Sequence, residues 1–238
     1  MGEKIIYLKD RKLINEFSLA MWFDYKKSGF TFEPGQYAKI TLLETIHQDE
    51  EGNSRLFSIA SSPINKETLM FTTRALNSAF NKNIQELPIG TKATISEPGG
   101  NTVLHKDPSI PAVFIIGGIG ITPVRCMVEY ATEGKLPYKM DLYYSNPVAN
   151  TMAFFDDLLR WEKENPNFKF HPTIDDANDK NWKYDFGYIN EEMLKKYIKD
   201  FSKPVFYIVG PLVMVDTMNE VLLKNGVNPE KIKLERFG

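Results

Sequence analysis

The stretch AVFIIGGIGITP, residues 112–123, decides the fold of the second half of the chain. Its first five residues are apolar, as in a buried strand, and three glycines follow within four positions. Gly117, Gly118 and Gly120 let backbone N–H groups come close to an anion. The helix predicted after Thr122 directs its positive end to the same place. Because the pattern is not a strict G-x-G-x-x-G, it predicts either a phosphate-binding loop or a plain tight turn.

Strand-like and helix-like segments alternate from about residue 108 onward. The strand-like segments are AVFII, KMDLYY, FKFHPT, VFYIV and KIKLERF. Helical patterns start near Pro123, Thr151, Asn190 and Pro211, and two glycines, Gly134 and Gly226, stand where C-caps belong. Five strands with four crossovers predict a doubly wound, five-stranded parallel sheet of the Rossmann type. We assign residues 108–238 to this α/β domain.

A second glycine-bearing loop, VGPLVM, ends the fourth strand of this sheet. Gly210 and Pro211 stand there just before another helix. Alone, the loop would be a plain strand-to-helix turn. In an open parallel sheet, however, ligands bind beyond the carboxyl ends of the strands, where the strand order reverses. Two such loops on the first and fourth strands therefore predict a crevice for an extended dinucleotide.

Residues 1–107 have the pattern of an antiparallel β domain. Strand-like runs occur at EFSLAMWF, QYAKITLL, RLFSIA, TLMFTTR and TKATISE. In the first of them Phe17, Leu19, Met21 and Phe23 alternate on one face. Turn signals rich in Pro and Gly separate the runs, so the sequence predicts a small barrel of about six strands, with a sandwich as the other arrangement.

The run RLFSIASSP, residues 55–63, combines a cation, a flat ring and a hydroxyl on one strand. The guanidinium of Arg55 can hold a pyrophosphate with two hydrogen bonds, and the ring of Phe57 can stack on a tricyclic ring system. The hydroxyl of Ser58 can form a hydrogen bond with a ring nitrogen. A flavin nucleotide needs all three groups. The alternative interpretation is an edge strand with a surface arginine.

A short helix is predicted within the same domain, over SAFNKNIQELP. Ser78 stands at its N-cap position and Pro88 stops it. The N-terminus of this helix is a second candidate anion site, and Arg74 is a second candidate cation.

Composition excludes several classes of function. The 238 residues carry a net charge of −2, which gives no field that would collect nucleic acid or anionic membrane. The single cysteine, Cys126, cannot form an internal disulfide or hold a cysteine-ligated iron-sulfur cluster. His47, His105 and His171 lack the spacing of a metal site, so we expect no metal. The acidic side chains of DDANDK, residues 175–180, are expected to be solvated.

The N-terminal residues carry charges every few positions and do not have the pattern of a signal peptide. The longest apolar run is too short and too broken by Gly and Pro to span a bilayer. We therefore expect a cytoplasmic protein without a membrane span.

Several of these motifs occur together and in a fixed order. RLFSIASSP, GGIGITPVRCM, LYYSNPVANTMAFFDDL, YIVGPLVMVDTM and the ending LERFG resemble the ferredoxin-NADP reductase superfamily of flavin oxidoreductases. The resemblance implies that the first domain is a six-stranded antiparallel barrel that holds FAD. It also implies that the second domain binds NADH or NADPH, with the nicotinamide stacked on the flavin between the domains.

The resemblance assigns roles to individual residues. Arg55 matches the phosphate-binding arginine, Phe57 the stacking aromatic, and Ser58 the hydroxyl beside flavin N5. The full set expected to bind FAD is Arg55, Leu56, Phe57, Ser58, Thr72, Arg74, Ser78, Ala79, Phe80 and Phe237. The set expected to bind the nicotinamide nucleotide is Gly118, Gly120, Thr122, Pro123, Ser145, Asn146, Gly210, Pro211 and Met214. Ser58, Thr122 and Glu235 are the residues expected to act in catalysis.

Two positions depart from the family pattern. Phe57 stands where the family usually has tyrosine, so one hydrogen bond to the ribityl chain, worth about 1 kcal/mol, is absent. Val209 stands where relatives often have cysteine. Because hydride transfer depends mainly on alignment and on the chemistry of the flavin itself, the valine is expected to slow this step without abolishing it.

The resemblance implies an enzyme that takes hydride from NADH or NADPH and passes electrons to a separate acceptor. A small ferredoxin-like redox protein is the first choice of acceptor, because the chain has no cluster of its own. The alternatives are a free-flavin reductase that holds its flavin loosely, and a non-catalytic subunit that senses FAD or nucleotide. No cation lies close to Ser145 and Asn146 in the sequence, so NADH is weakly preferred over NADPH. The oligomeric state is not encoded in any motif.

Overall fold

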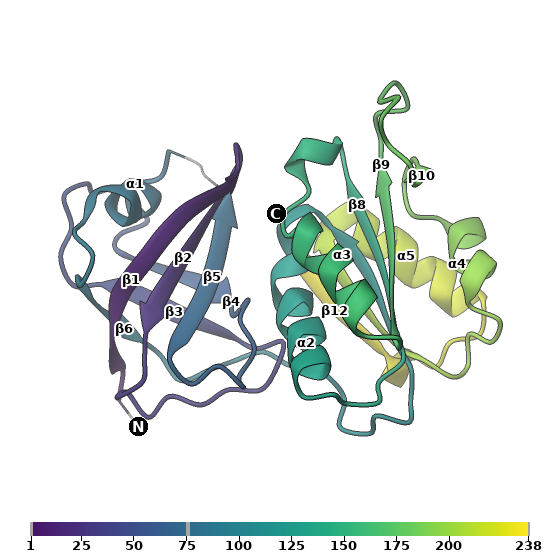
Figure 1. The fold of residues 1–238 in the computed structure, drawn as a ribbon, viewed down its shortest axis with the longest axis horizontal. Coiled ribbons are helices and arrows are strands. Elements are labelled where there is room, and N and C mark those ends of the chain that lie inside the picture. Colours follow the sequence, from purple (N-terminus) through teal and green to yellow (C-terminus); the bar gives the residue numbers. More distant parts are fainter. Residues whose placement is uncertain (1, 75–76, 238) are drawn as a thin grey trace. The chain divides into compact units, whose positions relative to one another are not determined.

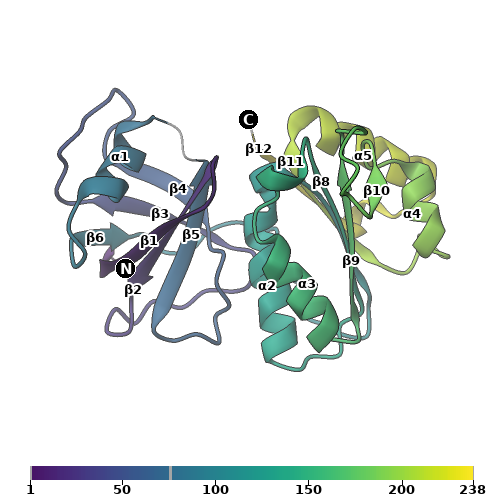
Figure 2. The same ribbon diagram turned by 45° about the horizontal axis from the view of Figure 1, so that its top comes forward.

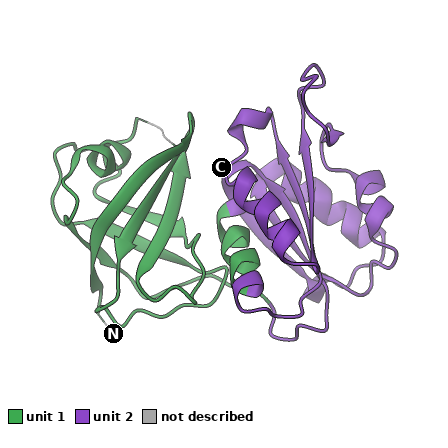
Figure 3. Ribbon diagram, viewed as in Figure 1, with its two compact units in different colours: residues 1–104, 122–130 green, residues 105–121, 131–238 purple. Residues whose placement is uncertain are grey.

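The computed structural model describes residues 2–74 and 77–237, and these fall into two compact units (Figure 3). The first contains the chain up to residue 104 together with residues 122–130. The second contains residues 105–121 and the chain from residue 131 onward. The division between residues 107 and 108 that the sequence suggests stays a prediction.

The first unit is built on a six-stranded antiparallel sheet (Figure 1). Its elements are β1 (Lys4–Asn15), β2 (Ser18–Asp24), β3 (Tyr37–Leu42), β4 (Ser54–Ser58), β5 (Thr68–Arg74), α1 (Ala79–Glu86) and β6 (Lys92–Ile95). The strand order is β4-β3-β6-β1-β2-β5. An antiparallel bridge between Ile59 and Phe71 joins the chain just after β4 to β5, so the two ends of the sheet meet. The predicted six-stranded antiparallel barrel is confirmed.

The alternation of apolar residues in β2 fills the core of the barrel. Leu19, Met21 and Phe23 are all buried there, as the period of two predicts. Phe17 was expected to belong to the same buried face, but it precedes the strand and is 53% exposed. The buried alternation therefore begins at Leu19. Helix α1 is capped by Ser78, whose side chain accepts a hydrogen bond from the backbone N–H of Asn81 at 3.3 Å.

The second unit contains a six-stranded parallel sheet. Its elements are β7 (Ala112–Gly117), α2 (Ile121–Glu133), β8 (Met140–Asn146), α3 (Phe155–Glu164), β9 (Phe168–Ile174), β10 (Asp185–Phe186), α4 (Glu191–Tyr197), β11 (Val205–Pro211), α5 (Leu212–Lys224) and β12 (Ile232–Phe237). Most of α2, residues 122–130, groups with the first unit. Figure 2 shows α3 on one face of the sheet and α4 and α5 on the other. The predicted Rossmann-like α/β domain is confirmed in its architecture.

The prediction of five strands was wrong by one. The order of the parallel sheet is β10-β9-β8-β7-β11-β12, and β10 is the additional strand. It has only two residues, Asp185 and Phe186, which pair with Thr173 and Ile174 of β9. Two residues cannot show an alternating pattern, so no sequence signal marks this strand.

The order of the remaining five strands places the reversal between β7 and β11. The chain moves from β7 to β8 and β9, and then returns to the other side of β7 for β11 and β12. The loops that leave β7 and β11 therefore lie at the predicted switch point, at the carboxyl edge of the sheet. None of the described helices is long and apolar enough to cross a membrane.

Candidate functional site

Arg55 on β4 is the first anchor of the candidate site in the first unit. Its Nη1 donates to the carbonyl oxygens of Glu51, Gly52 and Ser54 at 3.0, 2.9 and 2.8 Å. Its Nη2 forms ion pairs with Glu51 at 2.7 Å and Asp49 at 3.3 Å. The guanidinium carbon lies 5.7 Å from the centre of the Phe80 ring on α1, within the range of a cation–π contact. The strand and the preceding loop thus hold this cation near the start of α1.

The N-terminus of α1 and the Arg55 guanidinium both donate hydrogen bonds to the carboxylate of Asp49. The backbone N–H of Ala79 donates to Asp49 Oδ2 at 2.8 Å, and Arg55 Nη2 reaches the same carboxylate. The Ala79 hydrogen bond, and after it the Arg55 guanidinium, lower the pKa of Asp49, so this carboxylate is charged at neutral pH. We call these two donors, Arg55 and the Ala79 N–H, the anion site.

Phe57 lies two residues beyond Arg55 on β4 and is half-buried. Its ring centre is 5.4 Å from that of Phe80 and 6.2 Å from that of Phe71, and both contacts are tilted. Phe80 itself is buried in the barrel core. The ring expected to stack on a ligand is therefore supported from behind by two core aromatics.

Two hydroxyl-bearing residues, Ser58 and Thr72, adjoin an antiparallel bridge at the carboxyl end of β4. The antiparallel bridge between Ile59 and Phe71 places Ser58 opposite Thr72. The Oγ1 of Thr72 is buried and has no hydrogen-bond partner among the described residues. A buried hydroxyl without a partner is costly unless a ligand completes it. Ser58 and Thr72 could form hydrogen bonds with the polar edge of a ligand, and the anion site could bind a phosphate group of the same ligand.

Two other residues predicted to bind the flavin, Leu56 and Arg74, are exposed. Leu56 is 63% exposed and, by strand alternation, points away from the face that carries Arg55 and Phe57. Arg74 is exposed at the end of β5, and its carbonyl oxygen accepts a hydrogen bond from Asn81 Nδ2 at 2.8 Å.

An ion pair that the sequence did not point to fixes the turn after β4. Arg125 Nη1 donates to the carbonyl oxygen of Ala60 at 2.8 Å and pairs with Glu129 at 3.1 Å. Glu129 in turn accepts from the backbone N–H of Ser62 at 2.6 Å. All four residues belong to the first unit. The i,i+4 spacing of Arg125 and Glu129 on α2 was the available sequence signal, but the same spacing is typical of an exposed ion pair on a helix.

In the second unit, the two glycine loops pack directly on each other. A Cβ on Gly120 would lie 2.6 Å from the carbonyl oxygen of Val209, and one on Gly210 would lie 3.0 Å from the backbone nitrogen of Gly117. A Cβ on Gly117 would meet the sulfur of Met214 at 2.8 Å. Glycine is required here by the close approach of two backbones. The structure therefore brings the two predicted loops together at the carboxyl edge of β7 and β11.

The remaining predicted residues either lie in or just after the first loop in the sequence, or pair with the strand that leads into the second loop. Gly118 has φ of 53°, which favours glycine, and Thr122 and Pro123 are buried in the first turn of α2. On β12, Glu235 pairs with Val209 and Phe237 pairs with Pro211. Ser58, Thr122 and Glu235 belong to different parts of the chain, and their joint action in catalysis stays a prediction.

The carboxyl ends of β8 and β9 carry two polar groups with unused hydrogen-bonding capacity. Ser145 pairs with Gly117, and the next residue, Asn146, is buried with no hydrogen-bond partner for its Nδ2 among the described residues. Asp175 donates its backbone N–H to the carbonyl oxygen of Asn146 at 3.1 Å. Its Oδ1 is buried and likewise lacks a partner in the described chain, and burial raises the pKa of Asp175. The expectation that the carboxylates of this loop are solvated therefore fails for the Oδ1 of Asp175, because residue 175 directly follows a buried strand.

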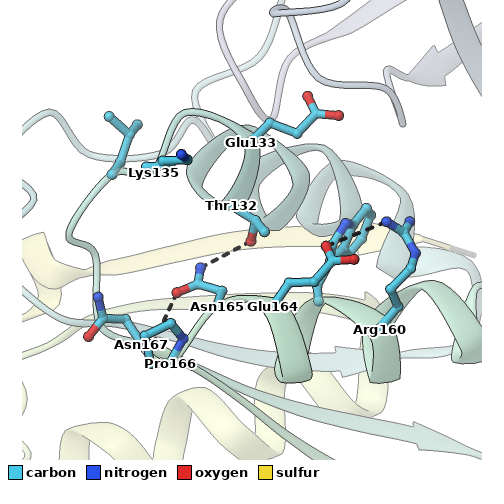
Figure 4. A pocket seen from close by; sticks show the side chains of 10 residues that line it. Thr132, Glu133, Lys135, Arg160, Glu164, Asn165, Pro166 and Asn167 are labelled. Carbon is cyan, nitrogen blue, oxygen red and sulfur yellow. Dashed lines mark hydrogen bonds and ion pairs between the residues drawn. The ribbon is translucent and has the colours of Figure 1, made fainter.

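A cavity of about 540 Å³ lies elsewhere in the second unit (Figure 4). It is lined by Thr132, Glu133, Lys135, Leu136, Arg160, Trp161, Glu164, Asn165, Pro166 and Asn167. Asn165 donates to Thr132 Oγ1 at 3.0 Å, and Arg160 pairs with Glu164 at 3.6 Å. The lining comes from the ends of α2 and α3 and the loops that lead into β8 and β9, at the amino edge of the sheet. It is therefore separate from the loops described above.

Comparison with known proteins bears on the class of this chain. Residues 114–220 match the family of oxidoreductase NAD-binding domains. One subunit of the Na(+)-translocating NADH-quinone reductase of Pseudoalteromonas atlantica, the one designated F, is 28% identical over 219 residues, covering 86% of this chain and 53% of that protein. Its counterpart in Idiomarina loihiensis is 29% identical over 219 residues, with the same coverage. The chain thus spans about half the length of these curated relatives.

Solved structures share the fold at low sequence identity. The FAD/NAD-binding domain of nitric oxide dioxygenase from Vibrio cholerae has a TM-score of 0.84 at 15% identity, and the match covers 100% of both chains. Ferredoxin-NADP+ reductase from Plasmodium falciparum has a TM-score of 0.79 at 16% identity, covering 99% of this chain and 96% of that one.

The family match and the shared fold confirm the resemblance found in the sequence. Residues 114–220 therefore match an oxidoreductase NAD-binding domain. The chain as a whole has the fold of the FAD/NAD-binding domain of nitric oxide dioxygenase and of ferredoxin-NADP+ reductase.

Proposed function

We propose that this chain binds FAD in its first unit, takes hydride from NADH, and passes electrons to a separate acceptor. The observation that carries the proposal is the convergence of Arg55 and the Ala79 N–H beside the ring of Phe57 and the unpartnered hydroxyl of Thr72. A cation and a helix N-terminus together hold phosphate groups, and an aromatic ring supports a planar ring system.

The residues present fit FAD. Arg55 and the Ala79 N–H would hold its pyrophosphate, Phe57 would support its ring system, and Ser58 and Thr72 would complete its polar edge. When bound, the flavin supplies the redox centre that accepts hydride and releases electrons to the acceptor. The glycine loops of the second unit would bind the nicotinamide nucleotide with their backbone N–H groups.

NADH is the proposed donor because of the pair formed by Asn146 and Asp175. The unused Nδ2 of Asn146 can donate to a ribose hydroxyl oxygen, and the unused Oδ1 of Asp175 can accept from a ribose hydroxyl group. A 2′-phosphate at the same place would face the carboxylate, and two negative charges in a partly buried site repel. The relatives named above are subunits of NADH-quinone reductases, which agrees with this choice.

Replacing Asp175 by serine is expected to lower the preference for NADH over NADPH. The substitution removes the negative charge that faces the 2′ position, so the ratio of the two kcat/KM values should fall by about tenfold or more, equivalent to about 1.4 kcal/mol. Steady-state kinetics with both nucleotides measures this ratio. Asp179→Asn removes the same charge from a partly exposed position of the same loop, where the side chain accepts from the backbone N–H of Asn181 at 2.9 Å, and should leave the ratio as it is. An unchanged ratio in Asp175→Ser would contradict the role of Asp175.

For the acceptor, we propose a separate redox protein, with free flavin as the second candidate. Support comes from the relatives, which are named as subunits of an NADH-quinone reductase. Cytoplasmic residence stays a prediction.

NADH oxidation by the FAD-loaded protein, measured with a [2Fe-2S] ferredoxin and separately with free FAD, tests this choice. Faster turnover with the ferredoxin supports a protein acceptor. Turnover with free FAD alone would make the chain a flavin reductase. Bound FAD that neither nucleotide reduces would favour the non-catalytic, sensing alternative.

A further inference from the structure

The acidic loop of residues 46–53 is fastened to α1 by specific hydrogen bonds. Asn83 Oδ1 accepts from the backbone N–H groups of Ile46 and His47 at 2.7 and 2.9 Å, and Asn83 Nδ2 donates to the His47 carbonyl oxygen at 2.8 Å. His47 Nε2 lies 2.8 Å from a carboxylate oxygen of Glu86. Asn83 is buried. The loop therefore has a defined position over α1.

This position delivers one carboxylate to the anion site. Asp49 Oδ2 accepts from the Ala79 N–H at 2.8 Å, and both carboxylate oxygens of Asp49 lie 3.3 to 3.4 Å from Arg55 Nη2. Glu51 from the same loop pairs with Arg55 at 2.7 Å. The two donors proposed to hold the FAD pyrophosphate are thus engaged by the chain's own acidic side chains.

A carboxylate and a pyrophosphate cannot use these donors together. The Ala79 N–H has one hydrogen and directs it to one acceptor. Two anions held by the same cation also repel each other over such short distances. An incoming phosphate group must therefore displace Asp49 from the Ala79 N–H.

We propose that Asp49 is an internal competitor of the FAD pyrophosphate, so that FAD binds only when the Asp49 carboxylate leaves the anion site. This inference rests on the proposed function, because it concerns the same flavin site. It has two consequences. Asp49 stabilises the protein without FAD by satisfying the donors of the anion site. It also raises the apparent Kd for FAD, which equals the intrinsic Kd divided by the fraction of molecules in which Asp49 has left the site.

Replacing Asp49 by asparagine tests the proposal on the full chain freed of FAD. The amide keeps the shape of the side chain and removes its charge. If Asp49 occupies the site in about nine molecules of ten, the Kd for FAD should fall by about tenfold. Isothermal titration calorimetry measures this Kd. The thermal midpoint of the FAD-free protein should fall in the same variant, and saturating FAD should narrow the difference from the unchanged protein.

Two further variants keep the test specific. Glu50→Gln removes one charge from the neighbouring exposed residue and should leave both the Kd and the midpoint unchanged. Asp49→Ala removes the acceptor altogether and should bind FAD at least as tightly as Asp49→Asn. An equal or weaker affinity for FAD in both Asp49 variants would overturn the proposal.

Inorganic pyrophosphate separates a failure of this proposal from a failure of the proposed function. If neither the unchanged protein nor the variants bind FAD, the flavin function fails. Tighter binding of pyrophosphate by Asp49→Asn than by the unchanged protein would still support displacement of Asp49 from the anion site. Equal binding of pyrophosphate in that case would overturn it.

Discussion

Replacing Gly120 by alanine is expected to slow reduction of the bound flavin by NADH by about 10²-fold, because shifts of about 1 Å in a positioning loop can have effects of this size. The new methyl group would lie 2.6 Å from the carbonyl oxygen of Val209 and 2.9 Å from its carbonyl carbon. Both atoms are backbone, so no flexible side chain can move aside. The loops after β7 and β11 must separate, and their N–H groups lose the arrangement that holds the nucleotide.

Anaerobic stopped-flow measurement of flavin bleaching by NADH checks this expectation. The affinity for FAD should not change, because the residues of the anion site belong to the other unit. Gly2→Ala adds the same methyl group where nothing lies within 4 Å, and it should reduce as fast as the unchanged protein. A normal rate in Gly120→Ala would show that the contact of the two loops does not position the nucleotide.

Replacing Arg55 by glutamine is expected to weaken FAD binding by about 10²-fold, since a charge-assisted hydrogen bond contributes about 1.5 to 3 kcal/mol. The guanidinium is the side-chain cation of the anion site, and the Ala79 N–H alone cannot balance a pyrophosphate. The variant also loses the ion pairs with Asp49 and Glu51, so the acidic loop would stand beside the phosphate without a cation.

Calorimetric titration with FAD measures the loss. Lys82→Gln removes a cation from the exposed face of α1 and should bind FAD normally, which separates a local role of Arg55 from a general effect of charge. If Arg55→Gln retained FAD as tightly as Lys82→Gln, the flavin phosphate would have to lie elsewhere.

The architecture was predictable from the sequence because each unit has its own periodicity. In the parallel sheet, the apolar run 112–116 and the glycines after it mark a buried strand and a close approach of backbones, and both are present. In the barrel, β2 alternates cleanly. Strand β1 was not among the runs recognised, since only Ile6 and Leu8 of its twelve residues are buried. An exposed strand carries no apolar pattern.

The candidate site was only partly predictable, because several of its features depend on contacts between distant segments. RLFSIASSP indicated a cation, a ring and a hydroxyl. It could not indicate that Asp49 engages Arg55, since the acidic loop had only the pattern of a turn. Asp175 resembled the other solvated carboxylates of its loop, and only the position of β9 buries its Oδ1. The pair of Arg125 and Glu129 resembled an ordinary exposed pair until the structure placed it against Ala60 and Ser62.

The most direct test of the central claim is the visible spectrum of the purified protein incubated with FAD, freed of excess FAD, and then titrated anaerobically with NADH and separately with NADPH. We expect flavin absorption bands that stay with the protein and bleach with NADH at lower concentrations than with NADPH. A folded protein that retains no flavin after this treatment, or whose bound flavin neither nucleotide bleaches, would contradict the proposed function as an NADH-dependent flavin oxidoreductase.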